Sequence, residues 1–527
     1  MKNKHRLFIV VSLIVLALEG AWMVYMGNGD ADENWWFYGA AAVAQGKLPH
    51  FDFLSHHNPL TYYAYAVPQY LFGSSMIVGR LTSLAFLLGT FFLTLRLCYR
   101  MGGAAALYLC SSLFVINLFS IYKNVLIHYQ ASQTFLLVAL VSVLFSDLTT
   151  VKKAFFTPLI AVLLIGVRYN CDYVILLFGL YLAWTLGRLS KAPVEARVTL
   201  ATAFAALLLL WGPHLLMGPE RFFFNTVTYL LDMGALKAGF GLAGYSLMTD
   251  FIMRLEWIKA TANNYMPVLV LLTWLGLVHL ERFIEARRRD GAFSLPGDPR
   301  YALIAAFIGV TFVFYLIPHS SDLASLVNFV FPLMVFLASV GFAQVLSDST
   351  PGEPGIQKRW MPATLVAFSF LLQIPVGVQN SFAYSWARAD MKNIGDVAAR
   401  IRALVPERGP IVTSTPLFVA EADREVLAGQ EMEYSSFFPT WSTEKAKRYR
   451  LLNWELLRDA VGRREAAALV LTERRFFNSM NYSRILDPYR KELLELIDRN
   501  YYVAETVEAP SSVWQGNTFI YLPRRDR

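Results

Sequence analysis

Three carboxylates lie within four positions of one another in the stretch DADENWWFYG, directly after the first long apolar segment: Asp30, Asp32 and Glu33. A carboxylate held against a hydroxyl group can take its proton while the hydroxyl oxygen attacks, which is general base catalysis. Acids at the start of a helix also cap the helix and complement its dipole. Capping needs one acid, so the group of three favours a chemical role for at least one of them, and Asp30 is a candidate to lie beside the same cavity.

Donors suited to an anionic group follow the acids along the chain. SHHNPL (55–60) contains His56, His57 and Asn58, and YKNVLIHYQASQTF (122–135) contains Lys123 and His128. Cations and N–H donors of this kind bind phosphate oxygens. These residues are candidates for a phosphate site, with Asn58 and His128 placed in its cavity.

Two arginines extend this set of phosphate-binding candidates. Arg168 ends an apolar segment, where an ionisable residue suggests function; an ion pair with Asp172 is the structural alternative. Arg254 belongs to the long stretch 218–264, where it either folds over a substrate or is only surface charge. Glu19, inside the first apolar segment, and His319, at the end of a later one, are candidates to line the cavity or are polar residues satisfied within the bundle.

The elements that must position these residues are apolar runs. The chain has 527 residues, of which 56% are hydrophobic and 16% charged. The excess of apolar residues lies in runs of roughly 20 residues, the length of a helix that crosses a bilayer. We therefore predict a polytopic α-helical membrane protein with about eleven transmembrane helices. The predicted spans are approximately 8–26, 79–95, 103–121, 130–146, 154–169, 171–186, 199–217, 265–280, 301–317, 324–346 and 360–379.

Basic residues gather in alternate loops between these spans, beginning with Lys2, Lys4 and Arg6 before the first one. Such loops remain in the cytoplasm, so the pattern predicts a cytoplasmic N-terminus. The net charge of +8 is then a signal of topology and gives no reason to expect nucleic acid as a partner. The first span is too long for an ordinary signal peptide and is expected to be an uncleaved anchor.

The first outside loop, 27–78, is rich in aromatic residues. Two helices are expected in it, an amphipathic one at 35–45 and a second at 61–73, and both are aromatic enough to lie in the membrane interface. They would hold the acids at the membrane surface, where a substrate with a lipid tail has its polar head. A second long outside loop covers 218–264.

The chain changes character after the membrane module, 1–380. Charges become dense in 381–527, and helix-like segments (390–404, 443–462, 483–499) alternate with β-branched ones (410–415, 467–472, 501–507, 519–523). This pattern predicts a small α/β domain. With an odd number of spans, this domain lies outside, on the same face as the first loop.

The three cysteines, Cys98, Cys110 and Cys171, lie in or beside apolar runs. An odd number cannot pair completely, and their spacing indicates neither a disulfide framework nor a zinc cluster. They are expected to be small core residues.

The ordered motifs of the first loop resemble the first outside loop of the GT-C membrane glycosyltransferases, in particular the branch of protein O-mannosyltransferases and aminoarabinose lipid A transferases. The matching elements are Asp32-Glu33, Trp35, Trp36 and Tyr38, Gly46 and Pro49, Asp52-Phe53, His57-Asn58-Pro59-Leu60, Phe72-Gly73 and Arg80. The resemblance implies an inverting enzyme that moves a sugar from a polyprenyl-phosphate donor, such as an undecaprenyl one, to an acceptor hydroxyl on the periplasmic face. Asp32 would be its base, and Glu33 would position Asp32 or contact the acceptor.

The sequence departs from this family at two places. Lipid A transferases have a lysine where this chain has Asn58, so His56 or His57 would supply the donor to the leaving phosphate. The same relatives have a second acid after the third span, where this chain has Lys123 and His128 but no carboxylate. A metal site shared by two acids is therefore not predicted, although a divalent ion remains possible, and no other cofactor is expected.

Two other functions fit parts of the sequence. A polymerase or ligase of lipid-linked oligosaccharides would also bind polyprenyl carriers, with its basic residues in 218–264. A transporter of polyprenyl lipids would use Glu19 and Arg168 as intramembrane charges but has little need for the acidic first loop. The expected partners are the polyprenyl-phosphate sugar, a glycan, lipid or protein acceptor, and the bilayer of a bacterial inner membrane.

Overall fold

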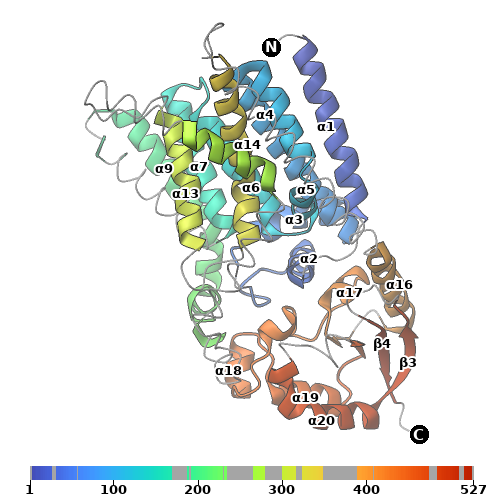
Figure 1. Ribbon diagram of the computed structural model, residues 1–527. Coiled ribbons are helices and arrows are strands. Elements are labelled where there is room, and N and C mark those ends of the chain that lie inside the picture. Colours follow the sequence, from blue (N-terminus) through green and yellow to red (C-terminus); the bar gives the residue numbers. More distant parts are fainter. Residues whose placement is uncertain are drawn as a thin grey trace.

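The computed structural model describes residues 3–25, 31–55, 57–168, 185, 187–188, 191–229, 231–233, 265–278, 299–315, 323–347, 388–406, 409–473, 483–509 and 516–524. These residues form a bundle of apolar helices with an α/β unit at one end (Figure 1). We call residues 388–524 the C-terminal unit. The predicted domain boundary at 380, the predicted span 360–379 and nearly all of 171–186 lie outside the described residues.

Five described helices are long and apolar enough to cross a membrane, and a bent pair makes up to six. The five are α1 (Asn3–Val24), α4 (Met76–Val115), α7 (Thr150–Val167), α9 (Pro193–Met217) and the Val327–Ser347 part of α14 (Leu323–Ser347). The bent pair is α5 (Leu118–Val125) and α6 (Tyr129–Leu144), at 110°. Shorter apolar helices are α13 (Pro299–Tyr315) and Tyr265–Val278. The chain is thus a polytopic helical membrane protein, and the number eleven stays a prediction.

The long helix α4 covers the first of the two predicted spans 79–95 and 103–121 and most of the second. It is interrupted at Gly103, whose φ of 68° and ψ of −153° are not helical. Glycine has no Cβ and takes such a backbone conformation without steric cost. The break lies where the sequence separates the two predicted spans.

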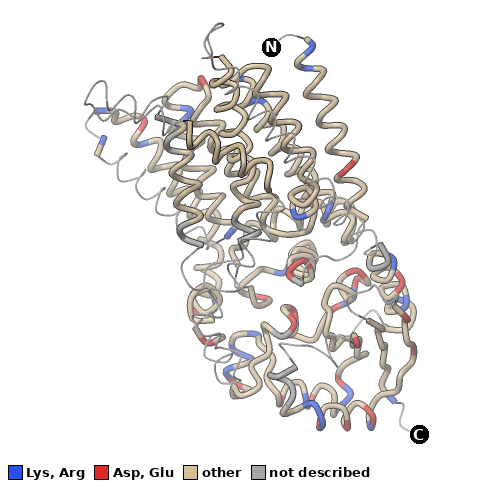
Figure 2. Tube along the Cα trace, in the orientation of Figure 1, with Lys and Arg blue, Asp and Glu red and all other residues tan. Residues whose placement is uncertain are grey.

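Charged residues are unevenly distributed over the molecule (Figure 2). Most of the bundle is drawn in tan and so carries no charged residues, whereas the blue Lys and Arg and the red Asp and Glu lie over the C-terminal unit and at the ends of helices. The N-terminus of α1 lies at the end of the bundle that is opposite the C-terminal unit (Figure 1). Polar surface for chemistry is therefore concentrated at one end of the bundle.

Helix α2 (Ala31–Ala44) lies between the bundle and the C-terminal unit (Figure 1). All of residues 33–42 are buried, and Trp36 and Phe37 share a hydrophobic cluster with Ile394 and Phe418 of the C-terminal unit. The expectation of an amphipathic helix lying in the membrane interface is wrong for α2. A helix that is apolar on all sides is buried in protein, and here the C-terminal unit covers the side that the bundle leaves open.

Helix α3 (Leu60–Phe72) keeps more of the predicted character. Its last turns expose Val67, Tyr70, Leu71 and Phe72, with Tyr70 74% and Phe72 76% exposed. Large apolar side chains exposed at one end of a membrane bundle fit a helix that rests against lipid. Close packing joins α3 to α2, because a Cβ on Gly39 would lie 2.3 Å from the Tyr62 ring.

The C-terminal unit contains a four-stranded sheet in the order β1-β2-β4-β3. Its strands are β1 (Ile411–Thr413), β2 (Ala468–Thr472), β3 (Tyr501–Val507) and β4 (Thr518–Pro523), each overlapping a predicted strand. The β1–β2 pair is parallel, and β4 pairs antiparallel with β2 and β3. The described helices of the unit are α16 (Arg388–Leu404), α17 (Pro416–Glu421), α18 (Thr443–Arg448), α19 (Trp454–Gly462) and α20 (Ser483–Asn500).

Two features of this unit differ from the sequence prediction. The predicted helix 443–462 is two helices, because Asn453 accepts a hydrogen bond from the Leu456 N–H and so starts α19 anew. Helix α17 was not predicted. It begins with Pro416 at its first position, which suits a helix start, but it is only six residues long and has no amphipathic period to detect.

Acidic side chains of the C-terminal unit hold the first loop and the start of α4. Glu421 accepts a hydrogen bond from the Met76 N–H at 2.9 Å, and Glu433 accepts one from the Asn34 side chain at 3.2 Å. Lys47 and Glu425 form an ion pair at 2.8 Å. The first loop is thus fixed from the side opposite the bundle.

Candidate active site

The candidate base Asp32 lies in the first turn of α2, where a carboxylate complements the helix dipole. Its side chain is 45% exposed, and its Oδ2 atom lies 3.8 Å from Nε2 of His128, whose side chain is 7% exposed. Asp32 is therefore accessible to a substrate while His128 is enclosed behind it. Two residues predicted separately, one as base and one for the cavity, lie together.

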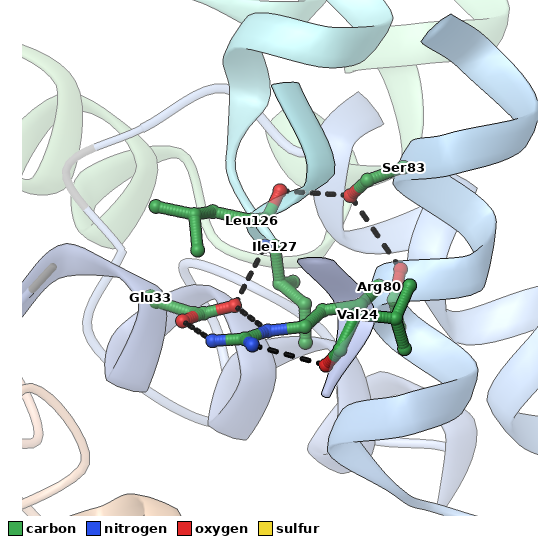
Figure 3. A network of polar contacts seen from close by, with 7 residues as sticks. Val24, Glu33, Arg80, Ser83, Leu126 and Ile127 are labelled. Atoms are coloured by element: carbon green, nitrogen blue, oxygen red, sulfur yellow. Dashed lines mark hydrogen bonds and ion pairs between the residues drawn. The ribbon is translucent and has the colours of Figure 1, made fainter. Parts of the chain in front are cut away.

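Glu33 points away from solvent and is fully buried, as is its partner Arg80 of α4. Arg80 donates from Nε and Nη2 to the two carboxylate oxygens at 2.8 and 2.7 Å (Figure 3). A third donor of Arg80, Nη1, reaches the Val24 carbonyl oxygen of α1 at 3.1 Å. Paired donors of this kind fix both charge and orientation. Glu33 can position Asp32, but its burial does not support contact with an acceptor.

The bend between α5 and α6, residues 126–128, receives side-chain partners from three other helices. The Ile127 N–H donates to Glu33 at 2.9 Å, and the Leu126 carbonyl accepts from Ser83 of α4 at 2.8 Å (Figure 3). The His128 carbonyl accepts from the Tyr65 hydroxyl of α3 at 2.9 Å. Non-helical backbone in a membrane protein is tolerated only where its polar groups are satisfied. The bend is therefore stabilised by side chains of neighbouring helices.

The bond from Ile127 to Glu33 also explains how Asp32 meets His128. The Ile127 N–H donates directly to the Glu33 carboxylate. Asp32 precedes Glu33 in the chain, and His128 follows Ile127. His128 starts α6, and its Nδ1 atom accepts from the Gln130 N–H, so Nε2 is the ring nitrogen left for Asp32. One buried contact thus sets the relative position of both side chains.

Aromatic rings connect these residues to two further candidates. His57 stacks on Trp36, with ring centroids 4.6 Å apart and planes at 25°. Arg168, directly after α7, lies with its guanidinium carbon 4.0 Å from the centre of the Tyr129 ring, and Tyr129 lies beside His128. A guanidinium over an aromatic face is held in a defined plane.

The loop that carries His57 is fixed through its backbone. The His57 carbonyl accepts from the Ser55 hydroxyl at 3.0 Å and contacts Nε2 of His50 at 2.9 Å. The Ser55 N–H donates to the side chain of Asn225 in the π-helical segment Phe224–Thr228, at 2.8 Å. These contacts hold the His57 ring against Trp36.

Tyr62 of α3 also lies within reach of the charge of Asp32. Burial raises the pKa of the Tyr62 hydroxyl above its ordinary value, a hydrogen bond with Ser55 opposes this, and the negative charge of Asp32 adds to it. The hydroxyl therefore stays protonated at neutral pH. Its ring packs on Trp36, with centroids 4.9 Å apart.

The other predicted residues have different surroundings. Asn58 is fully buried and donates to the Ile165 carbonyl of α7, so it secures a helix end and does not face an open cavity. Lys123 lies in the last turn of α5, and Glu19 is partly buried in α1. The buried Oε2 atom of Glu19 has no hydrogen-bond partner among the described residues. The predictions for Asp30, His56, Arg254 and His319 fall outside the described residues.

Sequence reasoning missed several residues that build the site. Arg80 was noted as part of a motif, but neither its pairing with Glu33 nor the roles of Ser83, Tyr65 and Tyr129 were predicted. A signal existed for Arg80, since it is a cation within an apolar span and such residues pair with a buried partner. Within the part of the chain that the structure describes, no three His, Cys, Asp or Glu side chains lie close enough together to hold a metal ion.

The fold as a whole is similar to that of solved membrane glycosyltransferases. Crystal structures of ArnT from Cupriavidus metallidurans, in the apo state and bound to undecaprenyl phosphate, match with TM-scores of 0.60 and 0.59. In both comparisons 98% of this chain and 97% of the other are covered, at 12% sequence identity. The chain therefore has the fold of ArnT over nearly its whole length.

A third structure is the archaeal oligosaccharyltransferase AglB from Archaeoglobus fulgidus, in complex with an inhibitory peptide and a dolichol-phosphate, at 11% identity and a TM-score of 0.49. All of this chain and 75% of AglB are covered. Because the score is below 0.5, this likeness adds nothing to the fold assignment. No protein-family model matches the chain, and no curated protein sequence matches it either.

Proposed function

We propose that this protein is an inverting glycosyltransferase that moves a sugar from a polyprenyl-phosphate carrier to an acceptor hydroxyl. The observation that carries the proposal is that Asp32, half exposed, lies in the first turn of α2, the helix between the bundle and the C-terminal unit (Figure 1), with His128 3.8 Å away. A lipid-borne donor and a polar acceptor can meet only at such a boundary. The acceptor is a glycan, a lipid or a protein.

In the proposed reaction Asp32 takes the proton of the acceptor hydroxyl. The hydroxyl oxygen forms a bond to the anomeric carbon, and the bond from that carbon to the phosphate oxygen breaks. The bonding electrons leave with the polyprenyl phosphate, and a single displacement inverts the anomeric configuration. A base oriented in this way contributes typically ~10²–10⁴ to the rate.

The departing phosphate gains negative charge and needs donors that are already in place. Arg168 and His57 are the candidates among the described residues, because each is stacked on an aromatic ring of the same group, Tyr129 and Trp36. Stacking leaves the N–H groups at the edge of a guanidinium or imidazole directed outward from the ring. Guanidinium groups are well suited to phosphate oxygens.

The ArnT likeness supports the carrier part of the proposal. ArnT is a GT-C aminoarabinose transferase, and one of its structures contains undecaprenyl phosphate. The shared fold extends over nearly the whole of both chains, which supports a carrier of the same chemical class for this protein. Residue roles in this chain rest on its own contacts.

The decisive assay uses purified protein and a monosaccharide linked to polyprenyl phosphate. Release of polyprenyl phosphate with transfer of the sugar supports the proposal. Release of pyrophosphate-linked carrier from an oligosaccharide-linked donor would instead support the polymerase or ligase function. Movement of the intact carrier across a vesicle membrane, without cleavage, would support the transporter.

Replacing Arg168 by alanine is expected to weaken carrier binding and slow transfer, because the guanidinium would no longer bind the phosphate. Arg168 lies beyond the end of α7 and is only partly buried, so the change should leave thermal unfolding near that of the wild type. The Michaelis constant for the donor and the rate of transfer are the measurements. A matched control is Arg221→Ala, whose side chain reaches the carbonyls of Phe51 and Arg448. Equal effects of the two changes on donor binding would contradict the assignment.

The protein is expected to lie in a bacterial inner membrane with its N-terminus in the cytoplasm and the C-terminal unit in the periplasm, because basic residues gather in alternate loops. Lys152 in the first turn of α7 and Lys491 of α20 are both exposed. Cysteines introduced at these two positions should react with a membrane-impermeant reagent from opposite sides. Reaction of both from one side would overturn this topology.

A further inference from the structure

The candidate base has an imidazole partner where a second carboxylate would be expected from the family resemblance. His128 Nε2 lies 3.8 Å from Asp32 Oδ2, within the distance of an ion pair. The pair comes from two elements 96 positions apart in the chain that the Glu33–Ile127 contact brings together. The proximity is therefore a product of the buried framework and not of neighbouring positions in sequence.

The hydrogen bonds of His128 define which of its nitrogens carries the proton. The Gln130 N–H donates to Nδ1 at 3.4 Å, so Nδ1 presents a lone pair. In a neutral imidazole the proton is then on Nε2, the atom that faces Asp32. The Nε2–H group lies 3.8 Å from the carboxylate, beyond hydrogen-bond distance, so a small movement of Asp32 would bring the two into contact without competition for the proton that the carboxylate must take.

Gln130, whose N–H donates to His128, is itself held by a series of buried polar side chains. Gln130 accepts a hydrogen bond from the side chain of Asn328 in α14, at 3.3 Å. The Asn328 oxygen accepts in turn from Ser120 at 2.7 Å and from Asn124 at 3.0 Å, both in α5. Asn328 is fully buried. The start of α6 is thus tied to two neighbouring helices by polar groups inside an apolar bundle.

Resting on the function proposed above, we propose that Asp32 and His128 form a base dyad in which the neutral imidazole positions the carboxylate, and in which a second proton on the imidazole switches the base off. Protonated His128 would pair with Asp32 as imidazolium and carboxylate. The carboxylate would then be stabilised as an anion and would be a weaker base.

Other charged groups lie around the dyad and act on the same equilibrium. They are Arg168 after α7, which lies over the Tyr129 ring, His57 of the first loop, which stacks on Trp36, and the Glu33–Arg80 pair of α2 and α4. The Glu33 charge is balanced by Arg80 in a bidentate pair.

Two substitutions separate the possible roles of His128. Asparagine places an oxygen near the position of Nδ1 and is a good start for a helix, but it is too short to reach Asp32. Glutamine places an N–H donor near the position of Nε2 but does not titrate. A residue that only starts α6 tolerates asparagine better, and a residue that orients Asp32 tolerates glutamine better.

The test uses the full-length protein with a polyprenyl-phosphate monosaccharide. For His128→Asn we expect wild-type thermal unfolding, an unchanged Michaelis constant for the donor and a kcat lowered about 10- to 100-fold, because the carboxylate loses the N–H group that can close on it in the reacting complex. For His128→Gln we expect kcat within a few-fold of wild type at neutral pH. Its acid limb in the pH profile should move to lower pH by about one unit or more, because only a carboxylate then titrates.

The outcomes test the Asp32–His128 dyad and the proposed glycosyltransferase activity separately. A wild-type kcat in His128→Asn, or an acid limb in His128→Gln that coincides with the wild type, overturns the dyad even if Asp32→Asn is inactive. If the wild-type protein transfers no sugar, the glycosyltransferase proposal fails, and nitrogen NMR of the histidine rings still tests the dyad. The expected ring signal is an Nε2–H tautomer that is lost in His128→Gln, and an Nδ1–H tautomer at that position would overturn it.

Discussion

Replacing Asp32 by asparagine is expected to lower the rate of sugar transfer by two orders of magnitude or more. Asparagine has nearly the same shape and also caps helices, so α2 should begin as before. It cannot accept the proton of an attacking hydroxyl, and an oriented base is worth ~10²–10⁴ in rate. The measurement is single-turnover transfer from a polyprenyl-phosphate monosaccharide, with carrier binding and thermal unfolding measured on the same protein.

The matched control for this change is Glu425→Gln. Glu425 is also an exposed acid near the first loop, where it pairs with Lys47 at 2.8 Å, but it belongs to the C-terminal unit. Its loss should leave transfer within a few-fold of wild type. Near-normal turnover in Asp32→Asn would show that Asp32 only caps α2. Loss of stability in the same variant would show that the side chain is part of the framework.

The second large effect is expected on stability, at the buried pair of Glu33 and Arg80. Arg80→Met leaves the Glu33 carboxylate buried without its cation, and breaking a buried pair in this way costs about 3–5 kcal/mol. The free energy of unfolding, or the shift in the unfolding temperature in detergent, is the measurement. Transfer should also fall, because Glu33 sets the position of Ile127 and so of His128.

A double variant separates loss of charge balance from loss of shape. Glu33→Gln combined with Arg80→Met removes both charges but keeps a side-chain oxygen for the Ile127 N–H. Most of the lost stability should return, because the uncompensated charge is gone. Lys47→Met, at an exposed pair, is the control and should cost about 1 kcal/mol or less. If Arg80→Met is no more harmful than Lys47→Met, the buried pair contributes little.

The features that could be predicted from the sequence are those determined by a single short stretch of the chain. All four described strands of the C-terminal unit were predicted, because short β-branched runs between charged segments are typical of strands. The strands are 411–413, 468–472, 501–507 and 518–523. Asp32 was singled out because acids, aromatic residues and a helix start follow one another in one stretch, and its role as a base stays a prediction. Long apolar runs likewise predicted α1, α7 and α9.

Features that failed prediction depend on distant partners. The burial of α2 could not be predicted, because the surface that covers it includes Phe418 and Ile394, hundreds of positions away. The meeting of Asp32 with His128 requires the bend at 126–128, which is stabilised by Glu33, Ser83 and Tyr65 and not by its own sequence. Nothing within YKNVLIHYQ identifies such a bend. Acids that look alike in sequence, Asp32 and Glu33, therefore have opposite surroundings.

The two-sided burial of α2 has a consequence for the order in which the protein is made. Glu33 binds Ile127, 94 residues later, but Asn34 binds Glu433, 399 residues later. During synthesis the first loop emerges long before its last partners exist. Such non-local contacts form late and leave apolar surface open to wrong associations in the meantime. In a nascent chain α2 therefore stays incompletely covered, and Asp32 takes its final position only when the last fifth of the polypeptide has been made.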